Sequence, residues 1–229
     1  MTIKEIYEKF DQIGCTTFST VCNGRAESRI AHFFAWDEDG IYFRTMTVKP
    51  FYKQVKEAGN ITVCGMYPSS QVTHDENNLP SFVPGYSMRL TGDVRELSME
   101  EVEEKAAHNR DFNVAVYDIK KYPATRIFLI YRAKGECYDF DYAKEHRDHK
   151  LERERFSYGG MEVEPAGLTI TEQCIGCGKC IKVCPGGVLY IGEDKKPHMR
   201  EFEEFGWNGC WKCEHCLAVC PEGAVSILD

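Results

Sequence analysis

The sequence predicts a mainly β, α+β fold: a small closed or split barrel of about six strands, followed by a smaller α+β domain. Two observations predict the barrel, and a third predicts the smaller domain. Short runs rich in Val, Thr and Phe are separated by tight-turn dipeptides, and few segments have helical periodicity. The third observation is that eight of the 12 cysteines fall between Cys174 and Cys220. We therefore expect a barrel over residues 1–143, a charged helix and linker over 144–165, and a cysteine-rich domain over 166–229.

The composition excludes several classes of protein. The formal net charge is −8 and no basic block is present, so we expect neither a nucleic-acid partner nor an anionic membrane, since both select clustered Lys and Arg. No apolar run approaches the roughly 20 residues that cross a bilayer. The first ten residues carry charges inside their apolar pattern, which is not the pattern of a secretory signal. We expect a globular, cytoplasmic protein.

The first elements follow from periodicity and turn chemistry. Apolar residues recur every three or four positions over residues 2–13, which predicts an amphipathic helix. A Thr- and Val-rich strand over 14–22 ends at Asn23-Gly24, a strong hairpin signal. Return strands are expected over 29–36 and 41–46.

The remaining barrel elements have clear boundaries. Pro50 suits a first helical position and Gly59 a C-terminal cap, which together predict a helix. Ser98 precedes Glu101 by three positions, as in a capping box, so a second helix is expected over about 98–109. Further strands are expected over residues 61–66, 86–97, 125–132 and 135–142.

Two polar segments lie outside the expected strands. Residues 68–85 form a long polar loop, which is either a functional lid or interface arm or a plain surface excursion. Residues 144–155 interleave both signs of charge at helical spacing, which predicts a solvated helix. Neither GxGxxG nor GxxxxGK[ST] is present, so Rossmann and P-loop chemistry are not supported.

The cysteine-rich tail contains the run CxxCxxCxxxCP twice. In bacterial ferredoxins the fourth cysteine of such a run ligates the other cluster. One [4Fe–4S] cluster is therefore expected on Cys174, Cys177, Cys180 and Cys220, and the second on Cys210, Cys213, Cys216 and Cys184. Zinc is the alternative, because it also binds C-x₂-C pairs. Zinc binding would not explain why two identical four-cysteine runs each end in Cys-Pro.

The other cysteines and the spacer between the two runs point to no specific chemistry. Cys15, Cys22, Cys64 and Cys137 are placed on expected strands, where free cysteine behaves as a small buried hydrophobe. Residues 189–209 are either a docking surface or an acidic insertion facing solvent.

Four segments of the first part together resemble the pyridoxamine-5′-phosphate-oxidase-like family: 18–30, 39–49, 52–55 and 88–98. The resemblance covers about residues 10–142. It implies a six-stranded FMN-binding split barrel, usually a homodimer with flavin at the subunit interface. The tail is similar to a bacterial-type two-cluster ferredoxin domain.

The resemblance also implies which residues contact FMN. Arg29, Thr45 and Lys49 match the family's phosphate-binding positions, with Thr47 nearby, and the pair Lys53-Gln54 matches less closely. Main chain at Ile30, Ala31 and His32 and at Arg44 would lie along the isoalloxazine ring. Arg and Lys are the side chains that a phosphate dianion needs. The alternative for Arg29 and Lys49 is a pair of exposed charges at strand ends.

These expectations combine into an iron–sulfur flavoprotein oxidoreductase. Electrons would pass from reduced ferredoxin or a similar donor through two [4Fe–4S] clusters to FMN, and then to a small-molecule acceptor, in an anaerobic setting. The catalytic residues are unknown; His32, His74 and Tyr158 are candidate proton donors. One alternative is an electron carrier that stores electrons for a partner protein. Another is a barrel that has lost flavin and binds haem.

Overall fold

The computed structural model describes residues 1–68, 72–141, 152–163, 167–200 and 210–228. It divides into two compact units. The first comprises Met1–Val72, Ser87–Glu136 and Phe156–Glu162, and the second comprises Thr73–Tyr86, Cys137–Arg155 and Val163–Asp229. Within the described residues, no helix is long and apolar enough to span a membrane.

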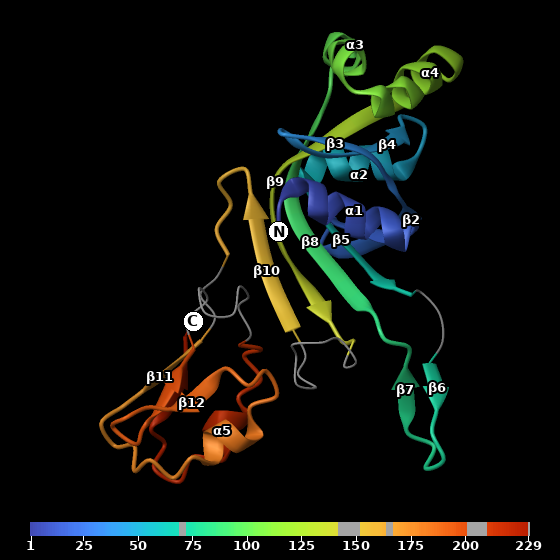
Figure 1. The fold of residues 1–229 in the computed structure, drawn as a ribbon. Coiled ribbons are helices and arrows are strands. Elements are labelled where there is room, and N and C mark those ends of the chain that lie inside the picture. The colour runs from blue at the N-terminus through green and yellow to red at the C-terminus, as the bar shows by residue number, and fades with distance from the viewer. Residues whose placement is uncertain (69–71, 142–151, 164–166, 201–209, 229) are drawn as a thin grey trace. The chain divides into compact units, whose positions relative to one another are not determined.

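The long sheet runs through β1 (Thr16–Cys22), β2 (Arg25–Ala31), β3 (Phe33–Asp37), β4 (Gly40–Met46), β5 (Asn60–Tyr67), β8 (Tyr86–Glu96), β9 (Thr125–Asp139) and β10 (Glu152–Tyr158). These eight strands pair in the order β2-β1-β5-β8-β9-β4-β3, and β10 pairs with β9. The register shows that β1–β2, β1–β5, β3–β4 and β4–β9 are antiparallel pairs. The predicted mainly β, α+β class is confirmed (Figure 1).

The connection between β2 and β3 shows that this sheet is rolled. The two strands lie at opposite ends of the pairing order, yet only His32 separates the end of β2 from the start of β3. Consecutive Cα atoms are about 3.8 Å apart, so one intervening residue holds the two edges of the sheet close together. This closure is the reason that the expected strand over 29–36 is in fact two strands.

Two other strand predictions differ from the structure. The runs expected as separate strands over 125–132 and 135–142 are one continuous strand, β9. The helix expected over 144–155 is wrong for its described part, because residues 152–155 belong to β10; residues 142–151 lie outside the described residues. The two signs of charge alternate at Glu152–Arg155, so a strand places both arginines on one face, and β9 supplies a pairing partner.

The helices of the first unit are α1 (Ile3–Ile13), α2 (Pro50–Ala58), α3 (Met99–His108), the 3₁₀ turn η1 (Arg110–Phe112) and α4 (Asn113–Lys121). Local signals for three elements are confirmed. Asn23 and Gly24 take left-handed φ values of 51° and 73° in the β1–β2 turn, and Gly59 caps α2 with φ 66°. Ser98 and Glu101 form the predicted capping box of α3.

Strand β4 is buried on both faces and separates two aromatic groups of the first unit. On one face Tyr42 meets Phe112 edge-on, with ring centroids 4.7 Å apart, beneath α3 and α4. On the other face Phe43 stacks on Phe128 at 5.4 Å and contacts Phe18 at 5.3 Å. The alternation of side chains along a strand produces this division.

The second unit contains β6 (Val72–His74), β7 (Pro80–Phe82), β11 (Leu168–Ile170), α5 (Lys179–Val183), β12 (Leu189–Ile191), β13 (Pro197–Met199), α7 (His215–Ala218) and β14 (Val225–Ile227). The polar segment 68–85 is therefore partly a two-stranded hairpin, β6–β7. Strand β11 pairs antiparallel with β14, and β12 with β13. Of the spacer 189–209, the described part is the β12–β13 hairpin, and residues 201–209 lie outside the described residues.

Candidate metal centres and cofactor site

Two cavities of the second unit are each lined by four cysteines. Cys174, Cys177, Cys180 and Cys220 line one of them, which we name cavity I. Cys184, Cys210, Cys213 and Cys216 line the other, cavity II. Each cavity receives three cysteines from one repeat and the fourth from the other repeat. The structure thus brings together the two groups that the spacing predicts as ligand sets.

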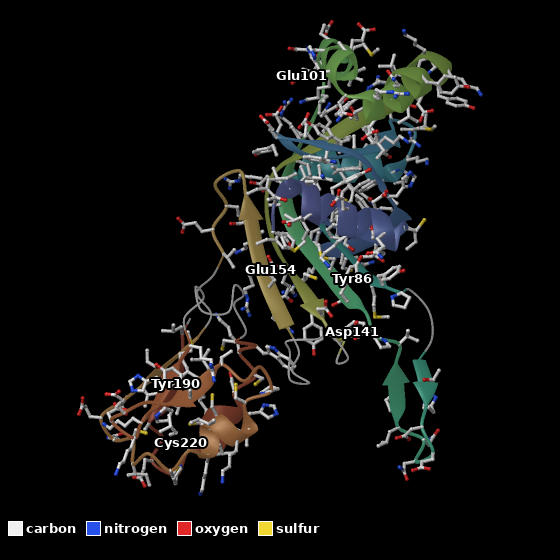
Figure 2. All side chains as sticks on the ribbon, viewed as in Figure 1. Tyr86, Glu101, Asp141, Glu154, Tyr190 and Cys220 are labelled. Carbon is white, nitrogen blue, oxygen red and sulfur yellow. The ribbon has the colours of Figure 1, made fainter. Side chains whose placement is uncertain are left out.

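The two cysteine loops have the same backbone shape. Gly176 and Gly178 take left-handed φ values of 70° and 68° in the first loop, and Lys212 and Glu214 take 52° and 62° at the matching positions of the second. Each loop then enters a short helix, α5 or α7. Three cysteines of each loop line one cavity, and the helix leads the chain to the fourth cysteine of the run, which lines the other cavity. Figure 2 labels one of these fourth cysteines, Cys220, in the second unit.

The chemistry of the donor set fits a soft metal centre. Four sulfur atoms per site are the ligand set of iron–sulfur clusters and of structural zinc. Burial raises the pKa of the Cys180 thiol and, at the matching position, of the Cys216 thiol. A metal must therefore displace protons from both thiols as it binds. Among the described residues, no three His, Cys, Asp or Glu side chains form a group that could hold a single metal ion.

The second cysteine loop has neighbours that the sequence did not single out. Arg155 of β10 donates a hydrogen bond from Nη2 to the Cys210 carbonyl oxygen at 2.8 Å. The ring of Trp211 meets the ring of Tyr138 edge-on at 5.3 Å, and Arg153 lies 4.8 Å from the Tyr138 ring centroid. The signal that could have identified this contact is the difference between Ile175 and Trp211 at matching positions of the two repeats.

Arg29 is the predicted phosphate-binding residue with the clearest surroundings. Its guanidinium on β2 lies 4.2 Å from the centroid of the Phe51 ring, and Nη2 donates to the Gln54 side-chain oxygen; both partners are on α2. Nη1 donates to the Glu27 carbonyl oxygen at 3.2 Å. Desolvation lowers the pKa of Arg29. The charge of Glu27 opposes this shift in pKa, and the two hydrogen-bond acceptors of the guanidinium, the Gln54 side-chain oxygen and the Glu27 carbonyl oxygen, are neutral.

Other predicted contacts gather at the start of α2. Lys49 precedes the helix without a capping side-chain hydrogen bond, and Lys53 and Gln54 follow within the helix. The Thr47 backbone N–H donates to the Ala124 carbonyl oxygen at 2.9 Å, and Thr45 is buried on β4. Lys49 and Lys53 are exposed. A helix N-terminus with cationic and hydroxyl side chains is a donor set that suits phosphate.

Five further predicted residues have the following surroundings. The Arg44 side chain forms an ion pair with Asp118 of α4 at 2.9 Å. Ile30 is 66% exposed on β2, and His32 is exposed at the β2–β3 connection. His74 is exposed on β6 of the second unit. Ala31 is half-buried at the end of β2.

The prediction for the scattered cysteines is mostly wrong. Only Cys137 is buried; Cys15 and Cys64 are exposed, and Cys22 is intermediate. Cys15 precedes β1 rather than lying on it, and Cys64 occupies an outward position of β5, where side chains alternate between the faces. Cys137 alone behaves as a small buried hydrophobe.

Comparisons with known proteins identify the C-terminal region. Residues 173–224 match the model of the 4Fe-4S dicluster domain family. No curated protein matches the chain.

Three solved structures match part of this chain over most of their own lengths. A NimC/NimA family protein from Clostridium acetobutylicum shares 19% identity over 68% of this chain and 92% of its own, with a TM-score of 0.49. A FAD-binding protein from Mesorhizobium loti shares 12% identity over 59% and 94%, with a TM-score of 0.40. The heme storage protein HutZ from Vibrio cholerae shares 12% identity over 57% and 90%, also with a TM-score of 0.40.

Proposed function

We propose that this chain is an iron–sulfur flavoprotein oxidoreductase, in which two [4Fe–4S] clusters exchange electrons with FMN, and FMN with a small-molecule acceptor. The observation that carries the proposal is the pair of four-cysteine cavities, each of which takes its fourth cysteine from the other repeat. The dicluster match over residues 173–224 supports it. Clusters conduct single electrons, so the other unit needs a redox group that can accept them.

The residues around α2 support FMN as that group. Arg29 would bind the phosphate, with its guanidinium held in place by Gln54 and Phe51. Lys49 and Lys53 would add positive charge at the start of the same helix. Flavin itself would supply the one- and two-electron chemistry, and the chain would anchor and orient it.

The proposed assembly is a homodimer with flavin at the interface between copies. Val21 on β1 and Ile30 on β2 are 60% and 66% exposed. Strand β2 is the first strand in the pairing order of the sheet, and β1 pairs with it. These exposed apolar side chains support burial by a second copy. We further propose a cytoplasmic location, an anaerobic setting and reduced ferredoxin or a similar protein as electron donor.

Anaerobic purification tests the cofactor content. We expect about eight iron atoms, about eight sulfides and one FMN per chain, with flavin absorption bands above a broad iron–sulfur shoulder. Zinc without sulfide would contradict the cluster proposal, and haem in place of flavin would contradict the FMN proposal. Saturable turnover of a small acceptor is expected; transfer to partner proteins alone would indicate an electron carrier instead.

The variant Arg29→Ala tests the phosphate site. We expect it to lose at least nine-tenths of its FMN, because the phosphate loses its principal cation, while iron and sulfide contents stay unchanged. Arg25→Ala is the matched control: Arg25 is an exposed arginine at the start of the same strand. Arg29→Lys should retain part of the FMN. Stoichiometric FMN in Arg29→Ala would show that Arg29 is not the phosphate ligand.

A further inference from the structure

We propose that Trp211 and Arg155 make the two clusters unequal, by raising the reduction potential of the cluster in cavity II above that of the cluster in cavity I. The first electron to enter the protein would then reside in cavity II. This inference rests on the proposed function, because it requires a cluster in each cavity. It assigns to two residues outside the ligand sets a role in determining where the electron resides.

Between their first three cysteines the two loops differ at all four intervening positions, and one of these differences places an indole ring at cavity II. Ile175 is 65% exposed in the first loop. Trp211, at the same place in the second loop, is partly buried and lies edge-on to Tyr138, with Arg153 at 5.9 Å from its ring centroid. The loops share backbone shape and cysteine spacing, and at this position only the second loop carries a large aromatic side chain that lines its cavity.

The indole N–H of Trp211 is a buried hydrogen-bond donor. Nε1 is buried and makes no hydrogen bond within the described part of the chain. Indole can only donate, and a buried donor without an acceptor is costly. Trp211 also lines cavity II. The sulfur atoms of a cluster in that cavity would supply the acceptor, and hydrogen bonds to cluster sulfur raise the reduction potential.

Arg155 adds positive charge at the same cluster. Its guanidinium donates to the backbone carbonyl of the ligand residue Cys210 at 2.8 Å. The charged side chains that line the cavities otherwise balance: Lys179 and Glu222 in cavity I, and Lys212 and Glu214 with His215 in cavity II. Reduction adds one negative charge to a cluster, so the nearby guanidinium favours the reduced state in cavity II.

Burial of the ligands acts in the opposite direction, and the two sets differ in it at one matching position. Cys210 is buried whereas Cys174 is intermediate, and loss of solvent disfavours the more highly charged reduced cluster. Cys177 and Cys213 are nevertheless both exposed, so each cluster keeps one ligand that faces solvent. We expect the two donors at cavity II, the Trp211 N–H and the Arg155 guanidinium, to outweigh this one difference in ligand burial.

The test is an anaerobic redox titration of the full holoprotein, followed by electron paramagnetic resonance of the reduced clusters. We expect two reduction steps in the wild type. Trp211→Phe keeps an aromatic side chain but removes the indole N–H. It should lower the equilibrium constant for reduction at the upper step by about tenfold, which is 59 mV for a one-electron couple. The lower step should stay in place. Ile175→Val, the matched substitution in the other loop, should leave the upper step unchanged.

Arg155 gives a second, independent variant. Arg155→Gln should also shift the upper step to lower potential, and Arg155→Lys should restore most of it, because the charge returns. An unchanged upper step in both Trp211→Phe and Arg155→Gln, or a shift of the lower step instead, would overturn the inference. Iron and sulfide analysis of each variant shows that both clusters are present. The cluster signals are read without reference to flavin, so absence of FMN would contradict the proposed function and leave this test intact.

Discussion

Tyr158 shows, at the scale of single residues, how burial decides the role of a side chain that could act as an acid. From the sequence, Tyr158 is a candidate proton donor. In the structure its hydroxyl donates to the Ile130 carbonyl oxygen at 3.0 Å, and burial raises the pKa of the phenol far above its ordinary value. A hydroxyl committed to a backbone acceptor and held neutral in this way serves the fold.

The substitution Tyr158→Phe tests this structural role. It removes one buried hydrogen bond and leaves a carbonyl without its donor, so we expect the free energy of unfolding to fall by about 1 kcal/mol. Urea unfolding measures the change, and Tyr131→Phe, at an exposed tyrosine of β9, is the control. A loss of acceptor turnover with unchanged stability would instead assign Tyr158 to catalysis.

Single residues were predictable where the chemistry is local to the sequence. The eight tail cysteines carry their grouping in their spacing, and the structure brings the same groups together. The surroundings of Trp211 were not predictable because it contacts Tyr138 and Arg153, which are distant in sequence. Cys64 was misplaced because strand alternation, rather than residue type, decides which face a side chain occupies.

At the scale of elements, the capping box of α3 was visible in the sequence and is formed in full. The Ser98 hydroxyl accepts from the Glu101 backbone N–H at 3.2 Å, and the Glu101 carboxylate accepts from the Ser98 N–H at 2.7 Å. The second bond is the main cause that lowers the pKa of Glu101. Two otherwise unpaired donors at the start of the helix are thereby satisfied.

Ser98→Ala is expected to lower the free energy of unfolding of the first unit by about 1 kcal/mol, the usual cost of losing an N-cap side chain. Ser98→Asp should recover most of that stability, because aspartate also accepts from the first-turn N–H groups. Thermal or urea unfolding provides the measurement. Equal stability of the alanine and aspartate variants would show that the cap contributes nothing here.

Elements whose limits depend on distant partners were predicted less well. The hairpin at Asn23-Gly24 and the cap at Gly59 depend on backbone conformations that a few residues encode. The division at His32 depends on the two edges of the sheet meeting, and β10 depends on the presence of β9. No local pattern records such pairings, so a charge run that fits a helix became a strand.

At the scale of the molecule, the two units depend on different interactions. The first has a large apolar and aromatic core around β4. The core of the second includes three cysteines assigned as ligands, Cys180, Cys210 and Cys216, together with a few small apolar side chains. If these cysteines bind clusters as proposed, we expect a core of that size to gain much of its stability from metal–ligand bonds.

Removal of iron from the full chain should therefore unfold one region and spare the other. We expect amide hydrogen exchange over residues 167–200 and 210–228 to accelerate by at least a hundredfold in the apoprotein, while β1, β4 and β5 keep their protection. Exchange measured peptide by peptide gives the readout, and reconstitution with iron and sulfide should reverse it. Full protection in the iron-free chain would show that the region folds without metal.

The pairing of β11 with β14 makes the cysteine-rich region a candidate for circular permutation. Leu168 faces Ile227 across these strands, so the region that holds both cavities begins and ends at the same place. A circular permutant with those two ends linked and a new opening in the β12–β13 turn would preserve both sets of four sulfurs. Conversely, deletion of β14 would remove the strand that pairs with β11 ahead of the first repeat.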